Sequence, residues 1–476
     1  TMSGKMSDPF LDALCAAIGA DRLTSELEAM APWLTDWRGR WTGTARALAE
    51  PRSTGEVAAL VALAAEHRVP IVPQGGNTSM VGGATPDSSG TALLLSLRRM
   101  NRIRAISPTM AVAEAGVILE HLHEAAAVQG SRFPLTLGAR GSATLGGLAA
   151  ANAGGTQVLR FGTMRRLVLG VEAVLPDGSV HDGLAALKKD NRGPSIDQLL
   201  IGAEGTLGLI TAVRLKLVPA VHQRAVAWLG LADPDAALAV LRALQASTDR
   251  VEGFEILPRD SLDAALAQVD GTRAPLAGQH PWNALVEATA GSPDEETPDA
   301  LLTRLLAPLL DRGLIADATI AANEAQADAF WRIRDSLSEA EKKHYGPATQ
   351  HDISVPVDHM PRFLREASAA VETAFPGTRA SGFGHLGDGN IHFHVRAMTR
   401  AKGDKAPDWV NQEGAAVTQL VDDLVTAAGG SISAEHGIGQ MKRTELARLS
   451  PTRVATIRAL KAGLDPKGLM NPGKLI

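Results

Sequence analysis

The sequence has little cysteine, few aromatic residues and no excess of basic charge. Only one of the 476 residues is a cysteine, Cys15, which excludes an intramolecular disulfide, a CxxC redox pair and a cysteine zinc cluster. Aromatic residues make up 4% of the chain, so the core must be built mainly from Ala, Leu and Val. Lys and Arg number 47 against 52 Asp and Glu, a net charge of −5 that argues against nucleic-acid binding.

Long apolar segments are also lacking. The longest apolar run, Val57–Ala65, is far shorter than the ~20 residues that a membrane-spanning helix needs. The segment Phe10–Ala20 contains Asp12 and has the periodicity of an amphipathic helix rather than of a signal peptide. We therefore expect no membrane span and a location in the bacterial cytoplasm.

Helix and strand patterns alternate along the chain, whose length predicts two to four domains. Ser53-Thr54 is a typical cap for a helix that ends near His67, and Pro70–Pro73 then has the pattern of a strand. Beyond Pro219 glycine becomes rarer while helix and strand patterns continue. This change predicts a second, smaller α+β domain.

Glycine is concentrated in three clusters within the first half, at Pro73–Gly83, Leu137–Gly155 and Gly202–Gly208. Successive small residues after a strand expose backbone N–H groups that bind anions such as a pyrophosphate. Each cluster alone is equally consistent with a flexible loop. Three of them in one domain favour a cleft for a long, flat cofactor that carries a pyrophosphate.

Another glycine pattern is misleading. Gly382–Gly387 matches G-x-G-x-x-G, but a dinucleotide fingerprint must follow a strand and open a helix. Here the next residues, Asn390–Val395, alternate as a strand does. This segment therefore does not indicate a Rossmann domain.

Histidines and a glutamate gather in the second half of the chain. His385 and His392 flank a glycine turn, and Glu435 and His436 lie in Ser433–Gly439. A single histidine is usually structural, but two imidazoles and a carboxylate among glycines form a ligand set suited to Zn²⁺ or Mn²⁺. The sequence therefore favours a metal site.

Three motifs carry a resemblance to a known family: P-Q-G-G-N-T, G-A-R-G-S and G-A-E-G-T-L-G. They resemble the FAD-linked D-2-hydroxy-acid dehydrogenases, a branch of the vanillyl-alcohol-oxidase type of flavoenzymes, over residues 40–476. The resemblance implies an α+β fold with a two-part FAD-binding domain. We expect an FAD-binding domain at 33–218, an α+β substrate domain with an antiparallel sheet at 219–429, and a C-terminal segment, 430–476, that returns to the flavin.

The resemblance also implies residues that bind FAD. FAD is expected to be non-covalent, because the first two clusters contain no histidine and Cys15 is remote in sequence. The implied residues are Pro73, Gln74, Gly75, Gly76, Asn77, Thr78, Met80, Gly82, Leu137, Gly138, Ser142, Thr144, Gly146, Gly147, Asn152, Gly154, Gly155, Glu204, Gly205, Ile210 and Asn471.

The motifs H-x-G-D-G-N-x-H and E-H-G-I-G imply the catalytic residues. His385, His392 and Glu435 correspond to metal ligands, and His436 corresponds to the general base. The implied reaction is oxidation of a D-2-hydroxy acid to a 2-oxo acid, with the metal polarising the hydroxyl and a hydride passing to flavin N5.

Substrate recognition is implied by the segment Phe330–Ser338. Arg334 and Ser338 are one helical turn apart and correspond to residues that bind the substrate's C1 carboxylate, with Ser in place of the commoner Thr. The chain departs from hydroxyglutarate dehydrogenases at Gln350, where they carry Lys, and at His394, where they carry Asn. Both positions are expected at the distal end of the substrate, so D-2-hydroxyglutarate, D-malate and D-lactate all remain candidates.

The expected electron acceptor is an electron-transfer flavoprotein or a quinone, and the expected assembly is a homodimer. One alternative is a phenol or alcohol oxidase of the vanillyl-alcohol type, which would not need two histidines and a glutamate. Another is a flavin-bearing subunit of a glycolate-oxidase-like complex. A metallohydrolase would leave the three glycine clusters without a role.

Overall fold

A computed structural model of the chain describes residues 8–398 and 408–476, and it separates into two units. The first unit consists of Thr1–Gly155, Gly162–Ala220 and Glu435–Ile476. The second consists of Thr156–Phe161 and Val221–Ala434. Among the described residues, we find no helix with the length and apolar character needed to cross a membrane.

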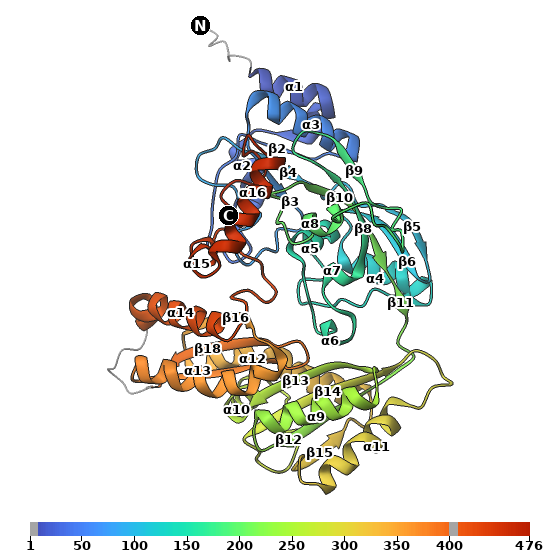
Figure 1. Cartoon of the computed structure of the whole chain (residues 1–476), viewed down its shortest axis with the longest axis vertical. Helices are drawn as coiled ribbons and strands as arrows, with labels where there is room; N and C mark the ends of the chain where they lie inside the picture. The colour runs from blue at the N-terminus through green and yellow to red at the C-terminus, as the bar shows by residue number, and fades with distance from the viewer. Residues whose placement is uncertain (1–7, 399–407) are drawn as a thin grey trace. The chain divides into compact units, whose positions relative to one another are not determined.

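The first unit is built on two sheets (Figure 1). One has the strand order β1-β2-β4-β3, in which β2, β4 and β3 run parallel, and the other is antiparallel with the order β5-β6-β10-β8-β9. The strands are β1 (Leu23–Thr24), β2 (Ala47–Ala49), β3 (Ile71–Gln74), β4 (Leu93–Ser96), β5 (Ile103–Ser107), β6 (Met110–Glu114), β8 (Val168–Val174), β9 (Val180–Asp182) and β10 (Leu209–Lys216), with β7 (Ser131–Arg132) and β11 (Val218–Pro219) forming a separate pair.

Helices cover these sheets, and the helices at the C-terminal end of the chain belong to the same unit. They are α1 (Pro9–Ile18), α2 (Leu27–Leu34), α3 (Thr54–His67), α4 (Leu119–Val128), α5 (Leu145–Ala151), α7 (Met164–Leu167), α8 (Ile196–Leu200), α15 (Arg443–Leu449) and α16 (Pro451–Leu464), with a 3₁₀ turn at Ala20–Arg22. The expected cap of α3 is confirmed, because the Ser53 side chain accepts a hydrogen bond from the Glu56 amide. Apolar side chains of α1 and α3 pack with β3 and β4 in one core.

The second unit is built on one seven-stranded antiparallel sheet with the order β15-β12-β14-β13-β17-β18-β16 (Figure 1). Its strands are β12 (Gln223–Leu231), β13 (Val251–Pro258), β14 (Trp282–Ala290), β15 (Asp317–Ile320), β16 (Ala348–Ser354), β17 (Thr378–His385) and β18 (Asn390–Ala397). Its helices are α6 (Val158–Phe161), α9 (Pro234–Ser247), α10 (Arg259–Gln268), α11 (Pro298–Asp311), α12 (Glu324–Tyr345), α13 (Met360–Ala374) and α14 (Trp409–Ala427), with a 3₁₀ turn at Val357–His359.

Helices cover both faces of this sheet. Phe254 and Ile256 of β13 belong to the core under α9, α11, α13 and α14, whereas Leu257 belongs to the core under α10 and α12. Because side chains alternate across a strand, Glu255 lies on the face that α10 and α12 cover. On β18, Ile391 and Phe393 point to the first core, so His392 and His394 share the opposite face, which follows from the strand that the sequence pattern predicted over Asn390–Val395.

Candidate functional site

The three glycine clusters lie against one another within the first unit. A Cβ on Gly75 would lie 2.2 Å from the Thr144 hydroxyl, and one on Gly76 would lie 2.0 Å from the Ser142 carbonyl oxygen. In the third cluster, a Cβ on Gly205 would lie 2.6 Å from the Pro73 ring. Only glycine permits these approaches, so the clusters are close-packed loops rather than flexible connections.

Side-chain oxygens from the predicted FAD residues have no hydrogen-bond partner in the structure. The Gln74 amide nitrogen donates to the carbonyls of Trp33 and Ala84, and that of Asn77 donates to Thr35, but neither amide oxygen is bonded. Among the predicted FAD residues, the buried side-chain oxygens without a hydrogen-bond partner are Gln74 Oε1, Asn77 Oδ1, Thr144 Oγ1 and Asn471 Oδ1. Buried polar atoms without a partner are rare, and these acceptors suit a ligand that carries hydroxyl and ring N–H donors.

Four of the predicted FAD residues have a backbone conformation in the left-handed region. Asn77, Asn152, Glu204 and Asn471 have φ values of 56°, 52°, 52° and 44°. This conformation is uncommon for residues other than glycine, and it concentrates where a site dictates the backbone.

Two of the predicted cofactor residues use their side chains to hold the protein itself. Asn152 Oδ1 accepts hydrogen bonds from the Thr163 hydroxyl and the Arg165 amide, both at 2.9 Å. Asn471 donates to the Gly83 and Glu204 carbonyls, which ties the C-terminal segment to the first and third clusters. The remaining predicted residues lie on the same loops or beside them in the first unit: Thr78, Met80, Gly82, Leu137, Gly138, Gly146, Gly147, Gly154, Gly155 and Ile210.

These observations fit FAD as a ligand of the first unit. The clusters supply small residues on loops that lie against one another, and the four buried oxygens supply acceptors. Gln74, Asn77, Thr144 and Asn471 are the side chains that would hold it.

In the second unit, predicted metal and substrate residues meet on the sheet face that α12 covers. Antiparallel pairing sets Glu255 of β13 opposite His385 of β17. His392 of β18 lies between Phe383 and Asp352 of the neighbouring strands. The imidazole centroids of His385 and His392 are 5.7 Å apart.

Arg334 reaches this face from α12. Its Nε donates to Glu255 Oε2 at 2.8 Å, and its Nη2 lies 3.0 Å from His385 Nε2. The second oxygen of Glu255 lies 2.6 Å from His385 Nδ1. An arginine can only donate hydrogen bonds, so His385 Nε2 accepts and its Nδ1 carries the proton that binds Glu255.

The charges of the site follow from burial and these contacts. Burial alone raises the pKa of Glu255, but the charges of Arg334 and His385 outweigh it and lower that pKa to about 2. Burial and the nearby Arg334 lower the pKa of His392 well below its usual range, so its imidazole is neutral, the form that binds metals. Burial raises the pKa of Asp388, in the turn between His385 and His392, to about 6.

His394 lies on the same face but has a separate partner. Its Nδ1 lies 2.7 Å from Glu341 of α12, and the Ser261 hydroxyl donates to the other oxygen of this carboxylate. His394 and Glu341 are both buried, whereas Gln350, directly opposite His394 on β16, is exposed. Ser338 is half-buried on α12, one turn from Arg334.

Glu435 and His436 open the C-terminal segment of the first unit. The residue before them, Ala434, donates its amide to the Asp352 carbonyl at 3.3 Å and ends the second unit. Beyond His436, the backbone amides of Ile438 and Gly439 each donate to Glu204 at 2.8 Å. Within the second unit the structure brings together His385, His392 and Arg334, and the roles proposed for Glu435 and His436 remain predictions.

Sequence reasoning missed Glu255 and Glu341. The only signal for Glu255 is a charged residue inside an otherwise apolar strand pattern, Phe254–Leu257, and Glu341 sits on the buried stripe of α12 with Leu337. A charge at a core position normally has a partner, so the sequence could have identified both glutamates as members of buried charge pairs.

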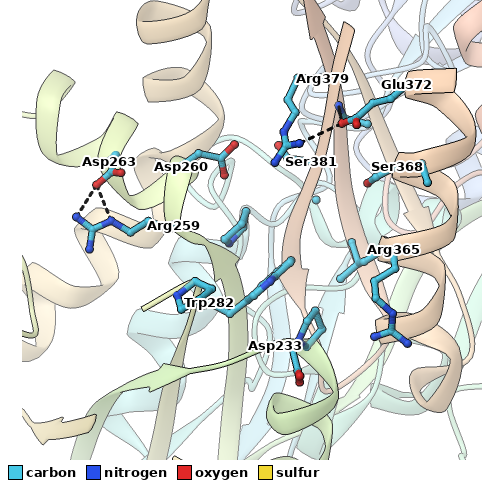
Figure 2. Close-up of a pocket in the computed structure, with 17 residues that line it drawn as sticks. Asp233, Arg259, Asp260, Asp263, Trp282, Arg365, Ser368, Glu372, Arg379 and Ser381 are labelled. Atoms are coloured by element: carbon cyan, nitrogen blue, oxygen red, sulfur yellow. Dashed lines mark hydrogen bonds and ion pairs between the residues drawn. The ribbon is translucent and has the colours of Figure 1, made fainter. Parts of the chain in front are cut away.

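A surface hollow of about 630 Å³ in the second unit lies apart from these residues (Figure 2). Helices α9, α10 and α13 and strand β17 contribute its walls. Two of its arginines are paired with acidic neighbours, Arg259 with Asp263 and Arg379 with Glu372. None of the predicted site residues lines it.

Comparison with known proteins identifies the family to which the chain belongs. Residues 45–183 match the family described as FAD binding domain, and residues 221–475 match the C-terminal domain of FAD linked oxidases. The chain belongs to the family of FAD-linked D-2-hydroxy-acid dehydrogenases. The expectations of an FAD-dependent oxidoreductase and of a two-domain α+β fold of the vanillyl-alcohol-oxidase type are thereby confirmed.

Curated relatives match nearly the whole length of this chain. A D-2-hydroxyglutarate dehydrogenase of Xanthomonas citri pv. viticola is 36% identical over 99% of this chain and 97% of its own. A mitochondrial D-2-hydroxyglutarate dehydrogenase of Arabidopsis thaliana is 33% identical over 96% of this chain and 80% of its own. Among solved structures, a p-cresol methylhydroxylase shares the fold with a TM-score of 0.71 and 16% identity, over 98% of this chain and 96% of that one.

Proposed function

We propose that this protein oxidises a D-2-hydroxy acid to the 2-oxo acid with non-covalent FAD and a divalent metal, Zn²⁺ or Mn²⁺. The observation that carries the proposal is the convergence of His385, His392 and Arg334 in the second unit of a chain from an FAD-binding family. A pair of imidazoles suits a metal, and a guanidinium suits a carboxylate. A 2-hydroxy acid presents both a hydroxyl and a carboxylate.

In this proposal His385, His392 and Glu435 hold the metal, which lowers the pKa of the substrate hydroxyl when bound. Gln74, Asn77, Thr144 and Asn471 would hold the flavin, which would supply the redox chemistry as the hydride acceptor. Arg334 and Ser338 orient the substrate carboxylate, and His436 takes the hydroxyl proton as general base. Electrons then pass to an electron-transfer flavoprotein or a quinone, and the enzyme works as a homodimer.

The substrate class follows from the relatives and from the distal positions. Both relatives described above are named for D-2-hydroxyglutarate, which makes it the first candidate, followed by D-malate and D-lactate. The exposed Gln350 and the paired His394 support a distal end that is polar.

The test is anaerobic bleaching of the flavin band near ~450 nm on purified, metal-loaded protein. The D- and L-isomers of 2-hydroxyglutarate, malate and lactate are added in turn. We expect a D-isomer to bleach the flavin, and expect a chelator or H436A to abolish the reaction. Bleaching that survives both treatments would contradict the metal and base assignments, and a chain that cannot be reconstituted with FAD would contradict the whole proposal.

A further inference from the structure

We propose that Glu255 is a positioning residue that fixes His385 and Arg334 relative to each other. This inference rests on the proposed function, in which His385 binds the metal and Arg334 binds the substrate carboxylate. A chelating 2-hydroxy acid would have to meet both groups at once. A carboxylate that holds both would therefore set the distance between the two ends of the substrate-binding site.

The geometry assigns one oxygen of Glu255 to each partner. Oε1 lies 2.6 Å from His385 Nδ1, and Oε2 accepts from Arg334 Nε at 2.8 Å. The side chain of Glu255 is 1% exposed, so water does not compete for either oxygen. Because β13 and β17 are directly paired at Glu255 and His385, the backbone also fixes this carboxylate beside the imidazole.

The contact with Glu255 prepares His385 to bind a metal. With its proton at Nδ1, the imidazole has its lone pair at Nε2, which accepts from Arg334 Nη2 at 3.0 Å in this structure and is the nitrogen that would bind a metal in its place. A carboxylate that accepts from the distal nitrogen of a metal-binding histidine fixes the tautomer and the ring plane, and raises the basicity of the ligand. Loss of such a partner typically lowers metal affinity about 10–100-fold.

The same contact aims Arg334. Glu255 holds the guanidinium at Nε, and this directs Nη2 to within 3.0 Å of His385 Nε2. The side of the Arg334 guanidinium that could bind a substrate carboxylate is thus held beside His385 Nε2, the nitrogen that could bind a metal. Replacement of Glu255 should therefore affect metal affinity and substrate KM together.

Strand β13 contains a matched control in Glu252. It is also 1% exposed, and its Oε1 accepts from Arg160 and from the Thr289 hydroxyl, both at 2.7 Å. Glu252 therefore shares with Glu255 the burial, the strand and an arginine partner, but its Oε1 is bound to a guanidinium and a hydroxyl rather than to an imidazole. A purely structural role for buried glutamates on β13 would make E252Q and E255Q behave alike.

The experiment compares the wild type with E255Q, E252Q and H385A as FAD-loaded full-length proteins. Binding of Zn²⁺ and of Mn²⁺ is measured by equilibrium dialysis, and kcat and KM by flavin reduction with the D-2-hydroxy acid that bleaches the wild type. A glutamine offers one acceptor oxygen and so can satisfy only one of the two donors. We expect E255Q to bind metal about 10–100-fold more weakly and to raise KM about tenfold.

The outcomes separate this inference from the proposed function. E252Q should keep its metal affinity and KM within about twofold of the wild type. If E255Q also does so while H385A has lost its metal, or if E252Q falls as far as E255Q, the positioning role is wrong. If H385A retains its metal, the ligand set of the proposed function is wrong as well. E255D keeps the charge with a shorter reach, and an affinity loss of about tenfold is expected there if E255Q does not fold.

Discussion

The carboxylate of Glu204 accepts a 2.8 Å hydrogen bond from the backbone amide of Ile438, and its second oxygen binds the next amide, that of Gly439. Two segments that are far apart in sequence are thereby joined inside the first unit. Gly437 is part of this contact, because a Cβ there would lie 2.9 Å from Glu204 Oε1 and its φ is +81°. The third glycine cluster thus holds the loop that follows His436.

We predict that E204Q destabilises the first unit and lowers turnover. Glutamine can accept only one of the two amide bonds, and its own N–H₂ group would face the other amide. The expected cost is about 1–3 kcal/mol in the free energy of unfolding, measured by urea denaturation. Turnover should fall further than stability explains if His436 is the base. E124Q, at an exposed position of the same unit, should change neither quantity, and an E204Q protein as stable as E124Q would contradict the prediction.

Two glycines in the predicted FAD loops should respond differently to alanine. A Cβ on Gly76 would lie 2.0 Å from a backbone carbonyl oxygen, so G76A must shift the loop and should cost about 1–3 kcal/mol even without FAD. A Cβ on Gly138 would meet no atom within 4 Å. G138A should therefore leave the FAD-free protein unchanged and weaken FAD binding only.

The measurement for both variants is thermal unfolding with and without FAD, together with titration of FAD by flavin fluorescence. G55A serves as a control for the general effect of alanine, because Gly55 lies in α3 and a Cβ there is free of close contacts. Unaltered FAD affinity in G138A would remove Gly138 from the binding site. Unaltered stability in FAD-free G76A would contradict the close packing of the loops.

Local sequence signals predicted much of this fold, and long-range pairing explains what they missed. The cap of α3 at Ser53 and the shared face of His392 and His394 depend only on neighbouring residues, and both are found. Glu255 and His385 are 130 residues apart, and only the sheet order brings β13 beside β17. The order of the strands in the sheet cannot be deduced from the periodicity of any single segment. Long-range packing also places Thr156–Phe161 in the second unit, although this segment follows the second glycine cluster in the sequence.

The stability of the first unit should increase with pH above 8 because of one buried lysine. Burial lowers the pKa of Lys474 from its usual 10.5 to about 8, against the opposing effect of Asp87, and its Nζ donates to the Pro472 carbonyl at 3.4 Å. Between these two pH values the unfolded chain keeps a proton that the folded chain releases. The free energy of unfolding therefore rises with pH across this range, and below pH 8 the buried charge is a constant cost.

The variant K474M removes this charge and tests the sign. It should be more stable than the wild type at pH 7, by up to about 3 kcal/mol, with the difference shrinking toward pH 10. Urea denaturation at pH 7, 8, 9 and 10, followed by circular dichroism, gives the difference directly. A K474M protein that is less stable at pH 7, or a difference that does not change with pH, would show that Lys474 is charged at no cost in the folded state.

The distal end of the substrate-binding site should accept a new cation at position 350. Gln350 is exposed and pairs directly with His394 across β16 and β18, at the position where the resemblance places a lysine in hydroxyglutarate dehydrogenases. Q350K adds a positive charge there without disturbing the buried His394–Glu341 pair. We expect kcat/KM for D-2-hydroxyglutarate to rise about tenfold relative to D-lactate, which corresponds to about 1.4 kcal/mol of transition-state binding.

Q350M has a similar length but no charge and should leave the ratio unchanged. Because the gain is electrostatic, it should also shrink as salt is added. A ratio that Q350K leaves unchanged, or that Q350M raises equally, would place the second carboxylate elsewhere or identify the natural substrate as a monocarboxylate.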